Sequence, residues 1–153
     1  MRALLILLAA FGLFSAAHAA DVVARGRVIK VLPFFLDQKG RNATSASLFD
    51  RDAYQAYLRL HTNEVSAVRY DIQWKDNSGS GKLLLRTELR GVDATGLPTL
   101  TKLEAEVASK RFSQWTNLTF GGEAYRKFGS VVAWRVTLWE GDQLLSEQKS
   151  FLW

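Results

Sequence analysis

The sequence predicts an all-β protein, an antiparallel β-sandwich of about eight strands. Apolar and polar residues alternate along most of the chain, as they do in strands that bury one face and leave the other in water. Short clusters rich in glycine, asparagine and aspartate separate the alternating runs. After residue 19, no stretch shows a helical period over ten or more residues.

The first nineteen residues predict a secretory signal peptide. Arg2 precedes an apolar run from Leu4 to Phe14, and Ala17-His18-Ala19 supplies the small residues of a cleavage site. The apolar run is short for a membrane span, and no second run follows it. We therefore expect one domain over residues 20–153, exported to the periplasm or the extracellular space.

The expected strands are defined by their alternating or β-branched composition. In chain order they are 22–32, the row Tyr54, Ala56, Leu58 and Leu60, then 68–75, 83–90, 102–107, 115–120, 131–139 and the segment after Glu140-Gly141-Asp142. The clearest is 68–75, where Val68, Tyr70, Ile72 and Trp74 alternate with charged or polar residues.

The connections between these strands also have recognisable sequences. Residues 76–81 predict a flexible hairpin loop, and Gly141 suits a tight turn that needs a positive φ. Residues 121–129, bounded by glycines, predict one short helical turn. The longest irregular segment runs from Pro33 to Phe49, and it is either a recognition loop or a connection that crosses between sheets.

Two aromatic residues give the sandwich a resemblance to a known family. Trp74 lies on the inward row of an early central strand, and Tyr125 precedes a strong late strand. These positions resemble the core tryptophan and the tyrosine corner of immunoglobulin and fibronectin type III domains, which implies an immunoglobulin-like sandwich. The C-terminal stretch 139–153 also resembles the ends of uncharacterised bacterial secreted proteins, a resemblance that implies no activity.

Composition excludes several classes of chemistry. The chain has no cysteine, which excludes thiol catalysis, thiolate metal sites and disulfides. His61 is the sole histidine after residue 19, so no histidine metal cluster is available. Removing Arg2 with the leader lowers the formal charge from +5 to +4, and the basic residues are scattered. We expect no metal, no cofactor and no nucleic-acid partner.

Carboxylates provide the one catalytic alternative. Asp50 and Asp52 are two residues apart, so on an extended chain both would point to the same side, as a carboxylate-dependent hydrolase requires. A local salt-bridge cluster with Arg51 is the simpler interpretation. We therefore expect a protein that is not an enzyme.

Aromatic and basic residues are the better candidates for binding. Phe35, Lys39 and Arg41 lie in the segment from Pro33 to Phe49, and Trp139 has the opposite parity to the inward Trp134. With Trp153 at the end of the chain, they form our candidate binding residues. The predicted function is an exported binding or assembly module that recognises a protein partner or an envelope glycan, and an edge strand could accept a partner's strand.

A small eight-stranded outer-membrane β-barrel is the other alternative. Trp153, Phe151 and Leu145 fit the alternation of a last barrel strand, but Glu147 and Lys149 would then face lipid. Membrane insertion is for this reason not the favoured interpretation.

Overall fold

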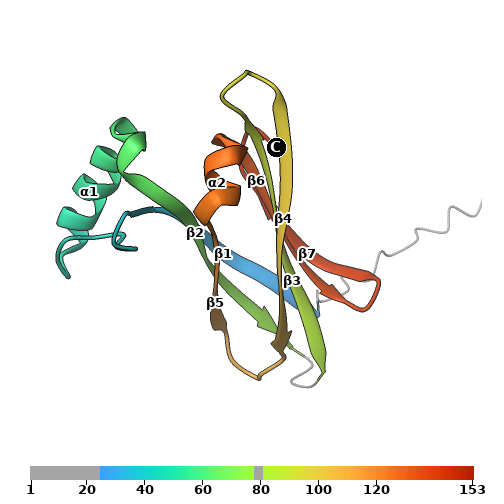
Figure 1. Cartoon of the computed structure of the whole chain (residues 1–153). Helices are drawn as coiled ribbons and strands as arrows, with labels where there is room; N and C mark the ends of the chain where they lie inside the picture. Colours follow the sequence, from blue (N-terminus) through green and yellow to red (C-terminus); the bar gives the residue numbers. More distant parts are fainter. Residues whose placement is uncertain (1–24, 78–80) are drawn as a thin grey trace, which may run out of the picture.

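The computed structural model describes residues 25–77 and 81–153. The predicted leader and residues 78–80 lie outside the described residues. The prediction of a hairpin at 76–81 was wrong, because the strands on either side, Val65–Asp76 and Lys82–Val92, belong to different sheets. Within them the chain forms seven strands, two short α-helices and one 3-10 turn (Figure 1). The strands are β1 (Gly26–Asp37), β2 (Val65–Asp76), β3 (Lys82–Val92), β4 (Pro98–Ala108), β5 (Gln114–Gly121), β6 (Ser130–Glu140) and β7 (Gln143–Lys149).

The strands confirm the predicted all-β sandwich. They form a three-stranded sheet with the order β1-β2-β5 and a four-stranded sheet with the order β4-β3-β6-β7. Every pairing is antiparallel. The predicted inward rows face one another across the two sheets, and the core includes Trp74, Leu85 and Val136, each at most 1% exposed.

The core contains polar side-chain atoms, and they differ in whether they have a hydrogen-bond partner. The indole N–H of Trp74 donates to Oγ1 of Thr116 at 2.9 Å, so the largest core side chain has its polar atom satisfied. Thr87, fully buried between the inward Leu85 and Leu89, has no hydrogen-bond partner for its Oγ1 among the described residues.

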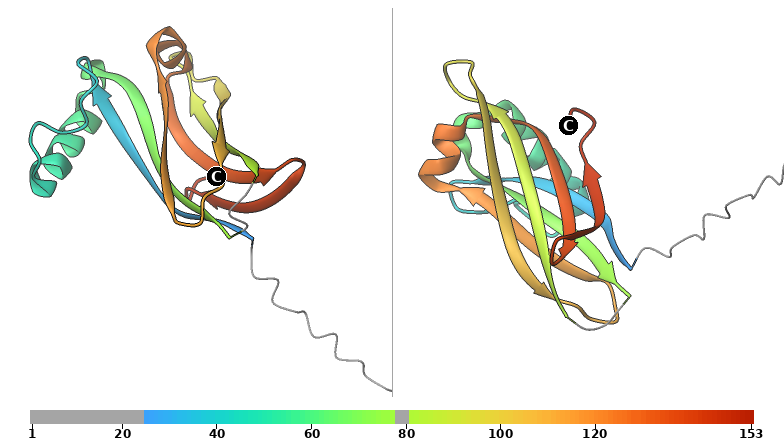
Figure 2. Two further views of the ribbon diagram at one scale, coloured as in Figure 1. Left: turned by 90° about the horizontal axis from the view of Figure 1, so that it is seen from below. Right: turned by 90° about the vertical axis from the view of Figure 1, so that its right-hand side faces the viewer.

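The two sheets are not parallel layers. Figure 2 (left) shows them meeting at one end and diverging toward the helices. At the closed end β1 contacts β7, where the Val28 N–H donates to Ser146 Oγ at 3.0 Å and Gln148 Nε2 donates to the Ile29 carbonyl at 3.1 Å. At the divergent end the β1–β2 pair carries α1 (Leu48–Leu60), and α2 (Gly122–Phe128) leads into β6.

Helix α1 overturns two predictions. The row from Tyr54 to Leu60 is helical, so the eighth expected strand is absent from the described residues, and a helix of 13 residues stands where none was predicted. Ser47 caps the helix by accepting from the Asp50 N–H, and Arg59 lies in the last turn, where a cation favours the helix dipole. The alternation of Tyr54, Ala56, Leu58 and Leu60 was a coincidence of spacing, because of these four only Leu58 is buried.

The segment from Pro33 to Phe49 is also more ordered than predicted. Strand β1 continues through Pro33 to Asp37, a turn and connection follow, and α1 begins at Leu48. The prediction of a single long irregular segment was therefore wrong, because β1 extends along β2 until Asp37 pairs with Val65.

The short helical turn near residue 125 is confirmed as α2. Its end at Gly129 has a φ of +83°, and a Cβ there would collide with the backbone of Val92 and Asp93. Neither α1 nor α2, nor the 3-10 turn η1 (Thr62–Glu64), is long and apolar enough to span a bilayer in the described part of the chain.

Candidate functional site

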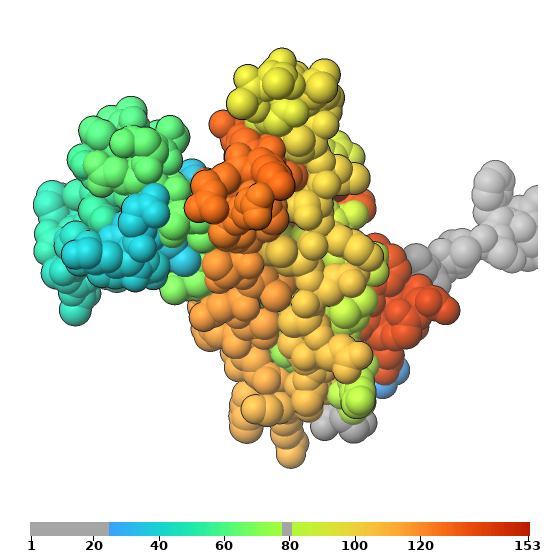
Figure 3. All heavy atoms as spheres, viewed as in Figure 1, coloured from blue at the N-terminus to red at the C-terminus, as the bar shows by residue number. Residues whose placement is uncertain are grey.

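A groove lies between the divergent ends of the two sheets. It consists of two adjoining cavities of about 420 and about 210 Å³ that share Phe35 and Val131, and we call it the inter-sheet groove. In Figure 3 the larger cavity corresponds to the notch between the lobe formed by α1 and η1 and the helix α2.

Each wall of the groove comes from one sheet. Phe35 pairs with the inward-facing Val68, which turns its ring toward the opposite sheet. Across the groove stand Val131 and Val132, the latter 47% exposed. The remaining lining consists of two arginines and of apolar or neutral residues, and the latter are Pro33, Phe34, Gln38, Thr62, Asn63, Val65, Tyr70, Tyr125, Gly129, Ser130, Trp134 and Ser150.

The charges in the groove have one sign. Arg126 lines the larger cavity and Arg59 the smaller one, and the described lining residues include no carboxylate. Burial raises the pKa of the Tyr125 phenol, so this side chain stays neutral at physiological pH. An apolar ligand that carries negative charge is thus electrostatically compatible with the groove.

Strand edges border the groove on both sides. Among the described strands β1 pairs with β2 alone, so its other edge is open between the contacts to β7 and to α1. Strand β7 pairs with β6 from Arg135 onward, so no other described strand pairs with residues 130–133 of β6 on that side. Open edges of this kind can accept backbone hydrogen bonds from an extended segment.

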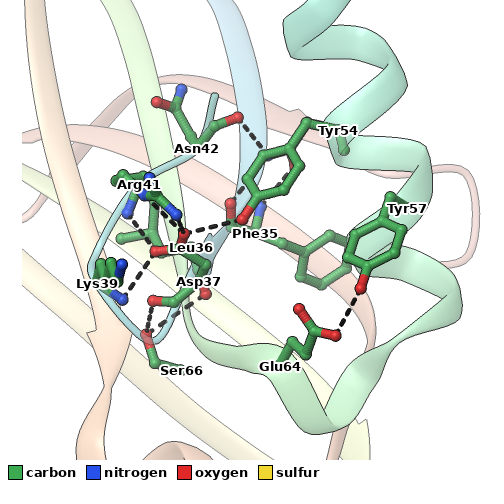
Figure 4. A network of polar contacts seen from close by, with 11 residues as sticks. Phe35, Leu36, Asp37, Lys39, Arg41, Asn42, Tyr54, Tyr57, Glu64 and Ser66 are labelled. Carbon is green, nitrogen blue, oxygen red and sulfur yellow. Dashed lines mark hydrogen bonds and ion pairs between the residues drawn. The ribbon is translucent and has the colours of Figure 1, made fainter. Parts of the chain in front are cut away.

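A carboxylate network fixes the end of β1 beside the groove (Figure 4). Asp37 accepts hydrogen bonds from the backbone N–H groups of Lys39 and Arg41, each at 2.8 Å, and from the Tyr54 hydroxyl at 2.8 Å. The Arg41 guanidinium completes the set at 2.8 Å. This one carboxylate thus joins β1, the following turn and α1.

The network also determines the ionisation of Asp37. Burial raises the pKa of this carboxyl, but the hydrogen bonds from Arg41, Tyr54 and Lys39 outweigh burial and lower it to about 2. The same contact with Asp37 raises the pKa of Arg41 and that of Tyr54. At neutral pH the Asp37 carboxylate and the Arg41 guanidinium are therefore both charged, and their ion pair holds the turn after β1.

The candidate binding residues fall into two separate groups. Phe35 lines the inter-sheet groove, whereas Lys39 and Arg41 belong to the turn that closes around Asp37 and line a smaller cavity of about 170 Å³ with Tyr54 and Glu64. Arg41 is engaged in holding that turn. The structure therefore places one of these three residues in the groove and the other two at its margin.

Trp139 and Trp153 lie on the outer face of the four-stranded sheet instead. The Arg86 guanidinium stands 5.5 Å from the centre of the Trp139 ring, and Arg90 and Arg135 stand 4.0 and 4.9 Å from the ring of Trp153. Both indoles are half-buried. Arginines of the same chain therefore stand over both rings.

The carboxylates considered for hydrolysis do not converge. Asp50 and Asp52 lie in the first turns of α1, where residues two apart point in different directions. Asp50 accepts from the Ser45 hydroxyl at 2.6 Å, and Asp52 pairs with Arg51 at 3.0 Å. The expectation that both face one side rested on an extended chain and was wrong.

Metal-binding clusters and the histidine were also considered as candidate sites. Among the described residues, no group of three or more histidine, cysteine, aspartate or glutamate side chains could hold a metal ion. His61 stacks on Tyr57 at the end of α1, with ring centres 3.9 Å apart.

No family model, curated protein or solved structure matches this chain.

Sequence reasoning missed most of the groove residues. The groove brings Phe35 together with Arg126, Val131 and Val132. They meet because α2 leads into β6, whose first residues lie opposite the end of β1. The glycine pair that bounds 121–129 was the available signal, since it marked where the chain passes from one sheet to the other.

Proposed function

We propose that the protein is an exported, non-catalytic binding module of the immunoglobulin or fibronectin III class, and that it recognises an extended apolar segment of a protein partner in the inter-sheet groove. The observation that carries this proposal is the pair of adjoining cavities that share Phe35 and Val131 and are bordered by open strand edges. Strand addition at such an edge supplies backbone hydrogen bonds, and the cavities receive alternate side chains.

The strand order supports the family resemblance. Strands β1, β2 and β5 form one sheet, and β4 pairs with β3 in the other. The same division occurs in immunoglobulin-like sandwiches whose fourth strand belongs to the sheet of the third and sixth strands. Trp74 departs from the immunoglobulin pattern, since it lies on the second strand and not on the third. The fold class by itself assigns no ligand.

Charge narrows the class of partner. With Arg59 and Arg126 in the two cavities and no carboxylate among the described lining, the favoured segment combines apolar residues with acidic ones. A glycan is less favoured, because arginines of the same chain already stand over the rings of Trp139 and Trp153, on which a sugar would have to stack.

A photo-crosslinking experiment in the native host tests the proposal. A photoreactive phenylalanine analogue replaces Val132, which is 47% exposed in the groove, or Leu100, which is 70% exposed on β4 and serves as the control. We expect a discrete protein adduct from position 132 and none from position 100. Val132→Asp should then weaken binding of a synthetic peptide from the crosslinked region at least tenfold, and Leu100→Asp should leave it unchanged.

Two results would contradict the proposal. Equal labelling from both positions would remove the groove as the binding site. A shift of tryptophan emission on titration with envelope glycans, abolished by Trp139→Ala and unaffected by Val132→Asp, would establish the glycan alternative.

A further inference from the structure

Helix α1 carries an apolar stripe on the side that faces away from the rest of the protein. Phe49 and Leu60 are 80% and 83% exposed, and Ala53 and Ala56 between them are exposed as well. At 3.6 residues per turn these four side chains lie within about 60° of one another. We call this set the α1 stripe.

The opposite side of α1 makes the contacts with the domain. Gln55 and Leu58 are buried, and the Arg51 guanidinium stands 5.4 Å from the Phe34 ring. Figure 1 shows α1 at the margin of the molecule, against the β1–β2 pair and remote from β7. The apolar residues of the stripe thus do nothing for the packing of their own domain.

We infer that the α1 stripe is the contact between two copies of this chain, which pair antiparallel through α1 about a two-fold axis. The stripe is symmetric in spacing about the midpoint between Tyr54 and Gln55. An antiparallel partner therefore places its Leu60 opposite Phe49 and its Ala56 opposite Ala53. The alanines at the centre permit close approach of the two helices, and one self-complementary patch is what a two-fold interface requires.

Charges flanking the stripe fit the same arrangement. Asp52 and Arg59 lie on one flank, and both are exposed. In the antiparallel pair, Arg59 of one copy lies about 3 Å along the axis from Asp52 of the other, which permits two symmetric ion pairs. A membrane surface suits this helix less well, because α1 carries Asp50 and Asp52 against Arg51 and Arg59 and has no net charge.

The size of the contact sets the expected affinity. A helix of 13 residues buries less than the roughly 800 Å² per partner of a standard interface. We expect a dissociation constant on the order of 10–100 µM. The inference does not depend on the proposed groove function.

Sedimentation equilibrium of the protein purified after expression of the full chain, predicted leader included, tests the dimer from about 1 µM to about 1 mM. We expect a monomer–dimer equilibrium. Ala56→Arg should raise the dissociation constant at least tenfold, whereas Phe112→Arg, at a 78% exposed position in the β4–β5 connection, should not change it. Asp52→Arg and Arg59→Asp should each weaken the dimer about fivefold, and the double charge reversal should restore it.

Cysteine trapping tests the orientation, because the chain has no cysteine of its own. An antiparallel pair brings residue 49 against residue 60 of the partner, while identical positions are about 16 Å apart along the axis. Phe49→Cys mixed with Leu60→Cys should therefore form a disulfide, and neither variant alone should do so.

Three results would overturn the inference. They are a monomer over the whole range, a dimer that Ala56→Arg leaves intact, and a double reversal no tighter than the single ones. If such a monomer binds vesicles of phosphatidylethanolamine and phosphatidylglycerol through Phe49 and Leu60, a membrane surface and not a second copy contacts the α1 stripe. Arg59 borders the inter-sheet groove, so the molar mass is measured without any groove ligand. Circular dichroism confirms the fold of each variant.

Discussion

The side chain of Gln55 pairs with the backbone of Phe35 as a neighbouring strand would. The Phe35 N–H donates to Oε1 of Gln55 at 2.8 Å, and Nε2 of Gln55 donates to the Phe35 carbonyl at 2.9 Å and to the Asn42 carbonyl at 2.9 Å. Gln55 is 3% exposed. One amide side chain therefore closes the open edge of β1 at this point and attaches α1 to the sandwich.

Gln55→Leu should loosen α1. The substitution leaves the N–H and C=O of Phe35 without partners beside the buried position 55, which costs about 1–3 kcal/mol. We expect faster hydrogen exchange at the Phe35 amide and a lower free energy of unfolding in urea. Gln38→Leu is the control, because Gln38 is exposed and its 3.4 Å bond to the Asn63 carbonyl is long. Unchanged exchange at Phe35 in Gln55→Leu would show that other contacts hold the helix.

The Asp37 network predicts a loss of stability in acid. The pKa of Asp37 is about 2 in the folded chain against 3.8 for an ordinary aspartate. A lowered folded pKa contributes stability that is complete above pH 3.8 and is lost as the pH falls toward 2. The contribution is at most about 2 kcal/mol.

Asp37→Asn should remove this part of the pH dependence. Urea unfolding between pH 5 and pH 2 should show a shallower decline in the variant, together with a lower stability at pH 7. Asp142, exposed in the β6–β7 turn, provides the control as Asp142→Asn. Parallel pH profiles for Asp37→Asn and the unsubstituted chain would contradict the assigned pKa.

Gly129→Ala should destabilise the junction between α2 and β6. The φ of +83° is costly for an L side chain, and the added Cβ would collide with the backbone of Val92, which cannot move as a side chain can. We expect a loss of about 3 kcal/mol or more in thermal unfolding. Gly96→Ala shares the positive φ but has open space around its Cβ, so it should cost only about 1–2 kcal/mol. Equal losses would mean that the close approach to Val92 is unimportant.

Thr87→Val should stabilise the protein. The substitution keeps the shape of the side chain and removes a buried hydroxyl whose Oγ1 has no hydrogen-bond partner among the described residues. We expect a gain of about 1 kcal/mol in urea unfolding. Thr119→Val, at an exposed position on β5, should change stability by less than about 0.5 kcal/mol. A loss of stability in Thr87→Val would indicate that the hydroxyl is satisfied in solution.

Helix α1 was not predicted, because its apolar residues alternate as they would in a strand. Tyr54, Ala56, Leu58 and Leu60 alternate as in a strand, yet Ser47 and Asp50 form a helix cap that the alternation concealed. The apolar stripe of α1 faces outward, and its buried side carries the polar Gln55 beside Leu58, so the helix lacks the usual division into an apolar buried face and a polar exposed face. Only the capping residues gave a local signal for this helix.

The sequence by itself determined the sandwich and its core, because strand alternation is a local pattern and burial of one face follows directly from it. Trp74 and the rows of β2, β3 and β6 are buried as that pattern predicts. The tertiary structure alone decided that the sheets diverge, that Phe35 meets Val131 and that Gln55 closes the edge of β1. These relationships join residues 20 to 96 positions apart through sheet twist and connection geometry, and no local periodicity encodes them.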